Sequence, residues 1–185
     1  MATSTTSSAS VTSWNIDSAH AAAEFKVRHM MISNVKGVIK GISGVLTEHA
    51  TDASLSSVDA TLDVSTLNTG EAQRDAHLKS GDFLELEKYP TITFKSTNVV
   101  HKGDAEYAVT GDLTIHGVTK PVTLAVEGPT PQHKDPWGNT RIGLSATTKI
   151  NRKDFGLNWN ATLETGGILV GEDVHITLEL EFIKA

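Results

Sequence analysis

The sequence predicts an all-β fold, an antiparallel barrel of eight strands with one short helix that caps an end. The first observation is that apolar and polar residues alternate along most of the chain, with the period of a half-buried strand. The second is that the alternating segments are joined by short connections, as in an antiparallel meander. The third is length, because strands of about 10 residues, or about 33 Å, suit a barrel better than a small sandwich.

The expected strands follow one another along the chain and place their apolar residues on one face. The extended segments cover residues 14–17, 21–28, 35–49, 58–64, 91–101, 107–115, 122–126, 142–150 and 174–182. The third of them contains Gly37, Gly41 and Gly44. Glycine inside a strand indicates a bend or a bulge, so we expect this segment to be strongly curved.

One stretch does not alternate and predicts the helix. Residues 71–79 contain good helix formers and no β-branched residue. Asn68 or Thr69 can cap its start, and Gly81 can end it. A helix of this length is not stable alone. We therefore expect Leu78 and Phe83 to anchor it as a fixed cap on the barrel.

Composition limits the organisation and the partners of the chain. A length of 185 residues predicts a single domain, which we assign to residues 14–185. The net charge of −6, without a basic block, argues against nucleic acid and against an anionic membrane surface as partners. The absence of cysteine excludes disulfides, cysteine-bound zinc and a thiol nucleophile. No apolar run approaches the ~18–20 residues that a membrane span needs.

The N-terminal tract, residues 1–13, is rich in serine, threonine and alanine and predicts a disordered tail. It lacks the basic and apolar regions of a signal peptide. We therefore expect a cytoplasmic protein, with a periplasmic location as the alternative if a leader has been removed.

The function depends on whether the barrel is filled or hollow. Aromatic residues make up only 5% of the chain, and many apolar-face positions are small, among them Ala21, Ala23, Ala60 and Ala146. Small inward residues leave room for an apolar ligand, whereas the larger aliphatic residues could also fill the space completely. Both alternatives stay open. The predicted ligand-binding residues are Phe25, Val27, His29, Met30, Ile32, Leu78, Phe83, Phe94, Leu113, Ile142, Leu144, Phe155, Trp159, Ile176 and Leu178.

No catalytic or metal-binding motif is present, so we predict no catalytic residue, no metal ligand and no required cofactor. The eight histidines form no HxH or HExxH motif, and GxSxG and P-loop signatures are missing. His29 continues an apolar face and is either a partly buried histidine or a contact to a ligand head group. Arg74, Asp75 and His77 either support the helix or contact a ligand. Arg152 either pairs with Asp154 or binds loop backbone.

Several stretches, taken together, resemble the YceI-like family from Trp14 to Phe182. They are Trp14-x-Ile16-Asp17-x-x-His20, Phe25-x-Val27-x-His29-Met30, Asn68-Thr69-Gly70, Arg74-Asp75-Ala76-His77-Leu78, Asp82-Phe83, Tyr89-Pro90-Thr91-Ile92-Thr93-Phe94, the segment 111–120 and Ile150-Asn151-Arg152-x-Asp154-Phe155-Gly156. The resemblance implies a lipocalin-like barrel with a long apolar tunnel that binds a polyisoprenoid or a quinone tail. It also implies a homodimer and, in many members, export to the periplasm. The chain departs from the family at Ala21, where serine is usual, and in lacking a signal peptide.

Three functional hypotheses follow. The first is non-catalytic binding, sequestration or transport of an amphiphilic isoprenoid-type lipid in the barrel. The second is an enzyme that acts on a small amphiphile at the barrel mouth through His29 or through Arg74, Asp75 and His77. The third is a stress-response protein with a filled barrel, which would have an exposed apolar patch and no cavity.

Overall fold

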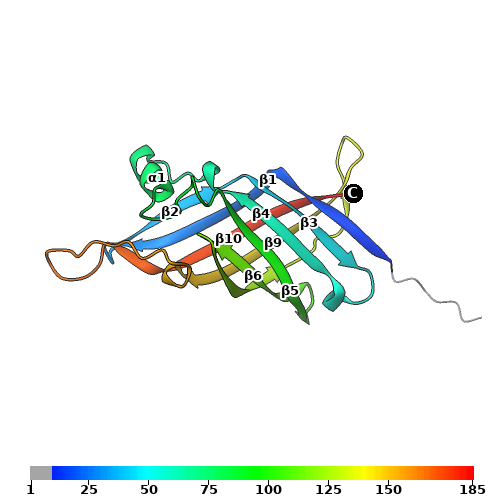
Figure 1. Cartoon of the computed structure of the whole chain (residues 1–185). Coiled ribbons are helices and arrows are strands. Elements are labelled where there is room, and N and C mark those ends of the chain that lie inside the picture. Colours follow the sequence, from blue (N-terminus) through cyan, green and yellow to red (C-terminus); the bar gives the residue numbers. More distant parts are fainter. Residues whose placement is uncertain (1–9) are drawn as a thin grey trace, which may run out of the picture.

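The computed structural model describes residues 10–185 and shows a closed, antiparallel β-barrel (Figure 1). Its strands are β1 (Val11–His29), β2 (Ser33–Ile39), β3 (Ile42–His49), β4 (Ser57–Asp63), β5 (Thr91–Gly103), β6 (Glu106–Ile115), β7 (Val118–Glu127), β8 (His133–Lys134), β9 (Thr140–Asn151) and β10 (Val170–Lys184). Within the described chain, the single α-helix is α1 (Ala72–Lys79), and three short 3-10 helices are η1 (Ala53–Leu55), η2 (Val64–Thr66) and η3 (Arg152–Phe155).

Eight of the strands form the ring, in the order β10-β1-β3-β4-β5-β6-β7-β9. The ring closes because β10 pairs with β9 as well as with β1, both in antiparallel register. The two remaining strands lie outside it, with β2 paired to β1 and β8 to β9. The predicted fold class, an eight-stranded antiparallel barrel with one short helix, is confirmed.

The barrel has two distinct ends (Figure 1). At one end lie α1, the β1–β2 turn and the β9–β10 connection; this is the α1 end. At the other, the far end, lie η1, the β7–β9 loop and the C terminus. None of the described helices is long and apolar enough to cross a membrane.

The predicted curved strand over residues 35–49 is broken into two, β2 and β3, at Lys40 and Gly41. Both pieces pair with β1, but β2 pairs with its second half and β3 with its beginning. The break arises because the backbone of Gly41 bonds to another segment. Its N–H donates to Thr66 Oγ1 at 3.1 Å and its carbonyl accepts from the N–H of Asp63 at 2.7 Å. The expectation of one continuous strand was therefore wrong.

Strand β1 is longer than the sequence indicated. It joins the segments 14–17 and 21–28 through an irregular stretch between Ile16 and Ala21. It also begins at Val11, which pairs with His49, so the strand starts inside the tract 1–13 that was assigned to a tail. Residues 1–9 of that tract lie outside the described residues.

Helix α1 starts one residue later than expected and is capped differently. Its N-cap is Glu71, whose carboxylate accepts from the N–H groups of Gln73 and Arg74 at 3.1 and 2.6 Å. The expected caps are engaged elsewhere, since Asn68 Oδ1 accepts from the N–H of Gly70 and Thr69 bonds to residues of the helix. The helix ends at Lys79, with Ser80 rather than Gly81 as the C-cap.

Candidate functional site

The barrel is hollow and encloses a cavity of about 950 Å³. Every strand of the ring contributes lining residues. One lining residue from each strand, in ring order, is Leu178, Phe25, Leu46, Leu62, Phe94, Leu113, Leu124 and Leu144. Of the two alternatives that the sequence left open, the structure shows the hollow barrel, which removes the basis of the filled-barrel hypothesis.

Small inward residues explain why the interior is not filled. Ala23, Ala60 and Ala146 line the cavity from β1, β4 and β9, where larger side chains would close it. A 150 Å³ apolar cavity holds a benzene molecule. The present volume is about six times larger and lies near the upper end of the ~300–1,000 Å³ range of ligand pockets. It is therefore large enough for an extended apolar molecule.

Most of the predicted ligand-binding residues lie on this cavity. Eleven of the fifteen line it, namely Phe25, Val27, His29, Leu78, Phe83, Phe94, Leu113, Leu144, Trp159, Ile176 and Leu178. Two others, Ile142 and Phe155, are buried in the core without lining the cavity. The last two, Met30 and Ile32, lie in the β1–β2 turn and are 39% and 75% exposed. Positive φ angles at Met30 and Met31 form the turn and end the alternation.

Sequence reasoning missed other residues that line the cavity. Leu46 follows the break at Gly41, so the inward parity could not be carried across it. Leu157, Leu169 and Val170 belong to the connection after η3, where no regular alternation exists. Arg28 lies next to the β1–β2 turn, in a position whose strand parity predicts a solvent-facing side chain.

Arg74, Asp75 and His77, the polar residues that the sequence singled out on the helix, make contacts that hold α1 in place. Asp75 accepts from the N–H and the hydroxyl of Thr69, and Arg74 donates to the Thr69 hydroxyl at 2.8 Å and to its carbonyl at 3.0 Å. His77 lies 2.8 Å from Asp82 and contacts the ring of Trp159 with centroids 4.7 Å apart. These contacts tie α1 to the preceding loop and to the barrel, while Arg74 and His77 also line the cavity.

Arg152 is a buried charge at the α1 end. The residue is 3% exposed and lines the cavity. It donates to the carbonyls of Leu157, Trp159, Val170 and Gly171, at distances of 2.5, 2.9, 3.2 and 2.8 Å. The alternative of binding loop backbone therefore describes it, and no ion pair with Asp154 occurs in the described structure. Burial lowers the pKa of the guanidinium because the charged form loses solvation.

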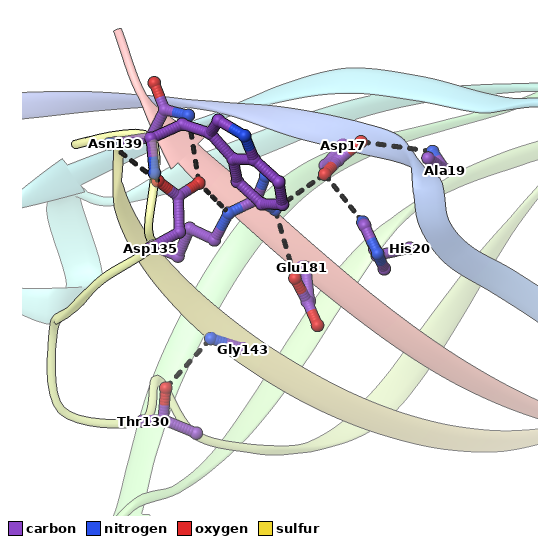
Figure 2. A network of polar contacts seen from close by, with 10 residues as sticks. Asp17, Ala19, His20, Thr130, Asp135, Asn139, Gly143 and Glu181 are labelled. Carbon is purple, nitrogen blue, oxygen red and sulfur yellow. Dashed lines mark hydrogen bonds and ion pairs between the residues drawn. The ribbon is translucent and has the colours of Figure 1, made fainter.

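A second polar cluster lies outside the cavity, towards the far end. Figure 2 shows Asp17, Asp135 and Glu181 converging on one centre, which is the guanidinium of Arg141, at distances of 2.6, 2.7 and 3.1 Å. Asp17, His20 and Glu181 lie close enough together to resemble a metal site. The guanidinium already provides the positive charge there, so we assign the cluster a structural role.

The ion pairs of Arg141 join the β7–β9 loop to β1 and β10. The hydrogen bond from Arg141, followed by that from His20, lowers the pKa of Asp17 from 3.8 to about 2. The pKa of Asp135 is also lowered, mainly by Arg141. A carboxylate with a depressed pKa stabilises the fold above its unfolded-state pKa and loses this contribution as the pH falls through the folded value. For Asp17 this window lies between 3.8 and about 2.

Comparisons with known proteins agree with this architecture. The YceI-like domain family matches residues 14–182. A UPF0312 protein of Vibrio cholerae is 42% identical over 139 residues, covering 75% of this chain and 73% of the relative. The crystal structure of the Campylobacter jejuni YCEI protein is 32% identical with a TM-score of 0.71, covering 85% of this chain and 89% of that one. A polyisoprenoid binding domain from Saccharophagus degradans is 16% identical with a TM-score of 0.67, covering 93% and 98%.

Proposed function

Because this chain belongs to the YceI-like family, we propose that it binds the apolar tail of an amphiphilic isoprenoid lipid inside its barrel and carries or sequesters it without catalysis. The observation that carries the proposal is the long cavity of about 950 Å³ with its predominantly aliphatic and aromatic lining. The polyisoprenoid binding domain of Saccharophagus degradans has the same fold and gives the class of ligand to test first.

The energetics of such binding follow from the lining. Each methylene group that leaves water contributes roughly 0.8 kcal/mol, so an isoprenoid tail of several units can bind tightly without an ion pair. Side chains such as Phe25, Phe94 and Leu178 offer contact along the barrel without a polar partner for the tail. Ordering a long tail costs conformational entropy, and this cost limits the affinity.

The catalytic alternative has weaker support. Its candidate group on α1 is used in the contacts of the cap, because Asp75 accepts from Thr69 and Arg74 donates to the same residue. His29 lines the cavity, and within residues 10–185 its imidazole takes part in no recorded side-chain hydrogen bond that would pair it with a nucleophile. The residues on the cavity therefore favour binding over turnover.

Native mass spectrometry of the purified protein tests the proposal. The protein is stripped of lipid and then incubated with a C20 isoprenol, and separately with a short C5 isoprenol as the control. We expect a one-to-one complex with the long alcohol and none with the short one, because only the long chain buries a large apolar area. Absence of a complex with the long alcohol would refute the proposal.

A further inference from the structure

Three arginines line the cavity at its α1 end without a carboxylate partner. They are Arg28, Arg74 and Arg152, called here the arginine mouth. In the described chain, residues 10–185, none of the three takes part in an ion pair. The chain as a whole has an excess of carboxylates, with a net charge of −6. Among the described residues, these three arginines are the Lys and Arg side chains that line the mainly apolar cavity, and this position sets them apart from the other cations.

A chain of contacts holds the arginine mouth together. A Cβ atom added to Gly171 would lie 3.0 Å from Arg28 Cβ, and the Gly171 carbonyl accepts from Arg152 Nε at 2.8 Å. Arg152 also donates to the carbonyl of Trp159, whose ring contacts the ring of His77. His77 lies one helical turn after Arg74 on α1. The three arginines, from β1, η3 and α1, thus line the same end of the cavity, with Arg28 exposed at its rim and Arg152 buried.

The guanidinium groups of Arg28 and Arg74 retain hydrogen-bonding capacity, whereas Arg152 already donates to four carbonyls. Each guanidinium has five N–H donors. In the described structure Arg28 uses a single recorded bond, from Nη2 to the Met31 carbonyl at 3.0 Å. Arg74 donates through Nε and Nη2, both to Thr69. Guanidinium forks match the oxygens of phosphate well, and an anion in a partly dry site gains more from them than it would in water.

The far end of the cavity has a different charge. Its polar lining includes the carboxylates of Glu48 and Asp52. Glu48 accepts from the indole N–H of Trp14 at 2.8 Å, and Asp52 caps η1 by accepting from the N–H of Ser54 at 2.9 Å. The acids that line the α1 end are Glu24 and Glu71, and the latter is engaged as the N-cap of α1. The two ends therefore differ in the sign of the charge that they offer.

We infer that the arginine mouth binds an anionic head group, a phosphate monoester on the isoprenoid, with the tail directed towards the far end. The inference rests on the proposed lipid binding and adds the class of head group and the orientation of the ligand. The positive mouth attracts the phosphate oxygens, and the carboxylates of the far end disfavour the reverse orientation. A neutral isoprenol fills the same cavity without this contribution.

The test compares two ligands with the same C20 tail, the isoprenyl monophosphate and the isoprenol, by isothermal titration calorimetry. The variants are the double substitution Arg28→Gln and Arg74→Gln, and a control, Lys95→Gln with Lys102→Gln, which removes the same charge from exposed residues away from the cavity. Arg152 is left unchanged because its bonds to four carbonyls hold the β9–β10 connection.

We expect the wild-type protein to bind the phosphate about tenfold or more tightly than the alcohol, because the charge contacts of the arginine mouth act on the phosphate alone. The double variant should lose most of this preference and retain its affinity for the alcohol, whereas the control keeps the preference. Higher salt should weaken binding of the phosphate alone.

Equal wild-type affinities for the two ligands, or an unchanged preference in the double variant, would overturn the inference and leave lipid binding in place. Failure of both ligands to bind would overturn lipid binding as well.

Discussion

A ring placed inside the barrel should weaken or abolish ligand binding and stabilise the empty protein. Ala146 is 5% exposed and lines the cavity from β9, where it pairs with Leu178 and with Val126. The substitution Ala146→Phe directs a phenyl ring into the bore. The bore of an eight-stranded barrel is just wide enough for one small ligand, so a single ring at this level interrupts it.

The magnitude follows from the volumes and areas involved. A phenyl ring occupies about the 150 Å³ that a benzene-sized cavity provides, which is about a sixth of the present cavity. Burying it contributes about 1.5–3 kcal/mol, less its lost rotamer freedom, and we expect a net gain of about 1–2 kcal/mol. For a domain of this size the melting temperature of the lipid-free protein should rise by about 2–8 °C.

The assay is thermal unfolding with and without a C20 isoprenol. At a ligand concentration of about 100 times Kd, the wild-type protein should gain about 2.7 kcal/mol, or about 5–10 °C. Ala146→Phe should show a smaller ligand-induced rise or none. The matched control is Ala125→Phe, because Ala125 is exposed on the outer face of neighbouring β7. A wild-type ligand response in Ala146→Phe would refute the assignment of the cavity as the binding site.

Three further predictions concern stability. Arg141→Gln should lower the unfolding free energy at neutral pH and lower it less near pH 2, because the hydrogen bond from the guanidinium is the largest cause of the depressed pKa of Asp17, ahead of that from His20; urea titrations at both pH values check this. Gly44→Ala should destabilise the folded protein by about 2–4 kcal/mol, because the added Cβ would lie 2.2 Å from a backbone oxygen. In the control Gly81→Ala the added Cβ meets nothing within 4 Å, so the same urea titration should show little change. Glu71→Ala should remove the N-cap of α1 and cost about 1 kcal/mol, and amide hydrogen exchange should show faster exchange confined to the helix.

The architecture could be predicted because a closed antiparallel barrel has one wet and one dry face along every strand. In β10, residues of the predicted apolar face such as Ile176 and Leu178 line the cavity, while Glu179 and His175 are exposed. The same periodicity located β5, β6 and β9 to within a few residues. Two-residue alternation is a local property, and local properties are what a sequence shows directly.

The errors occur where contacts across the chain override local preference. The break between β2 and β3 depends on bonds from Gly41 to Asp63 and Thr66, more than twenty residues away. The cap of α1 moved to Glu71 because Thr69 is engaged by the side chains of the helix. Neither the strand break nor the position of the cap can be recognised from the local sequence alone. The homodimer expected from the resemblance stays a prediction.

The candidate site was predictable in part, for the same reason. Its aliphatic wall follows from strand parity, but the volume of the interior depends on how eight faces meet, which no single strand reveals. The arginine mouth could not be predicted from the sequence, because Arg28, Arg74 and Arg152 lie on three different elements. They become one feature only when β1, α1 and the β9–β10 connection meet at the α1 end.

A hollow barrel also has a consequence for stability that links the fold to its ligand. The side chains around the cavity face no packing partner across it, so they lose dispersion contacts that a filled core would have. The stability of the fold therefore depends more on the hydrogen bonds between the strands of the closed ring and on the two ends of the barrel than it would with a filled core. The Arg141 ion pairs hold one end, and the contacts of α1 with Thr69 and Trp159 hold the other. A bound tail supplies the missing contacts and binds only the folded state, so it stabilises the protein by mass action. The stability of this protein should accordingly rise with the concentration of the lipid that it binds.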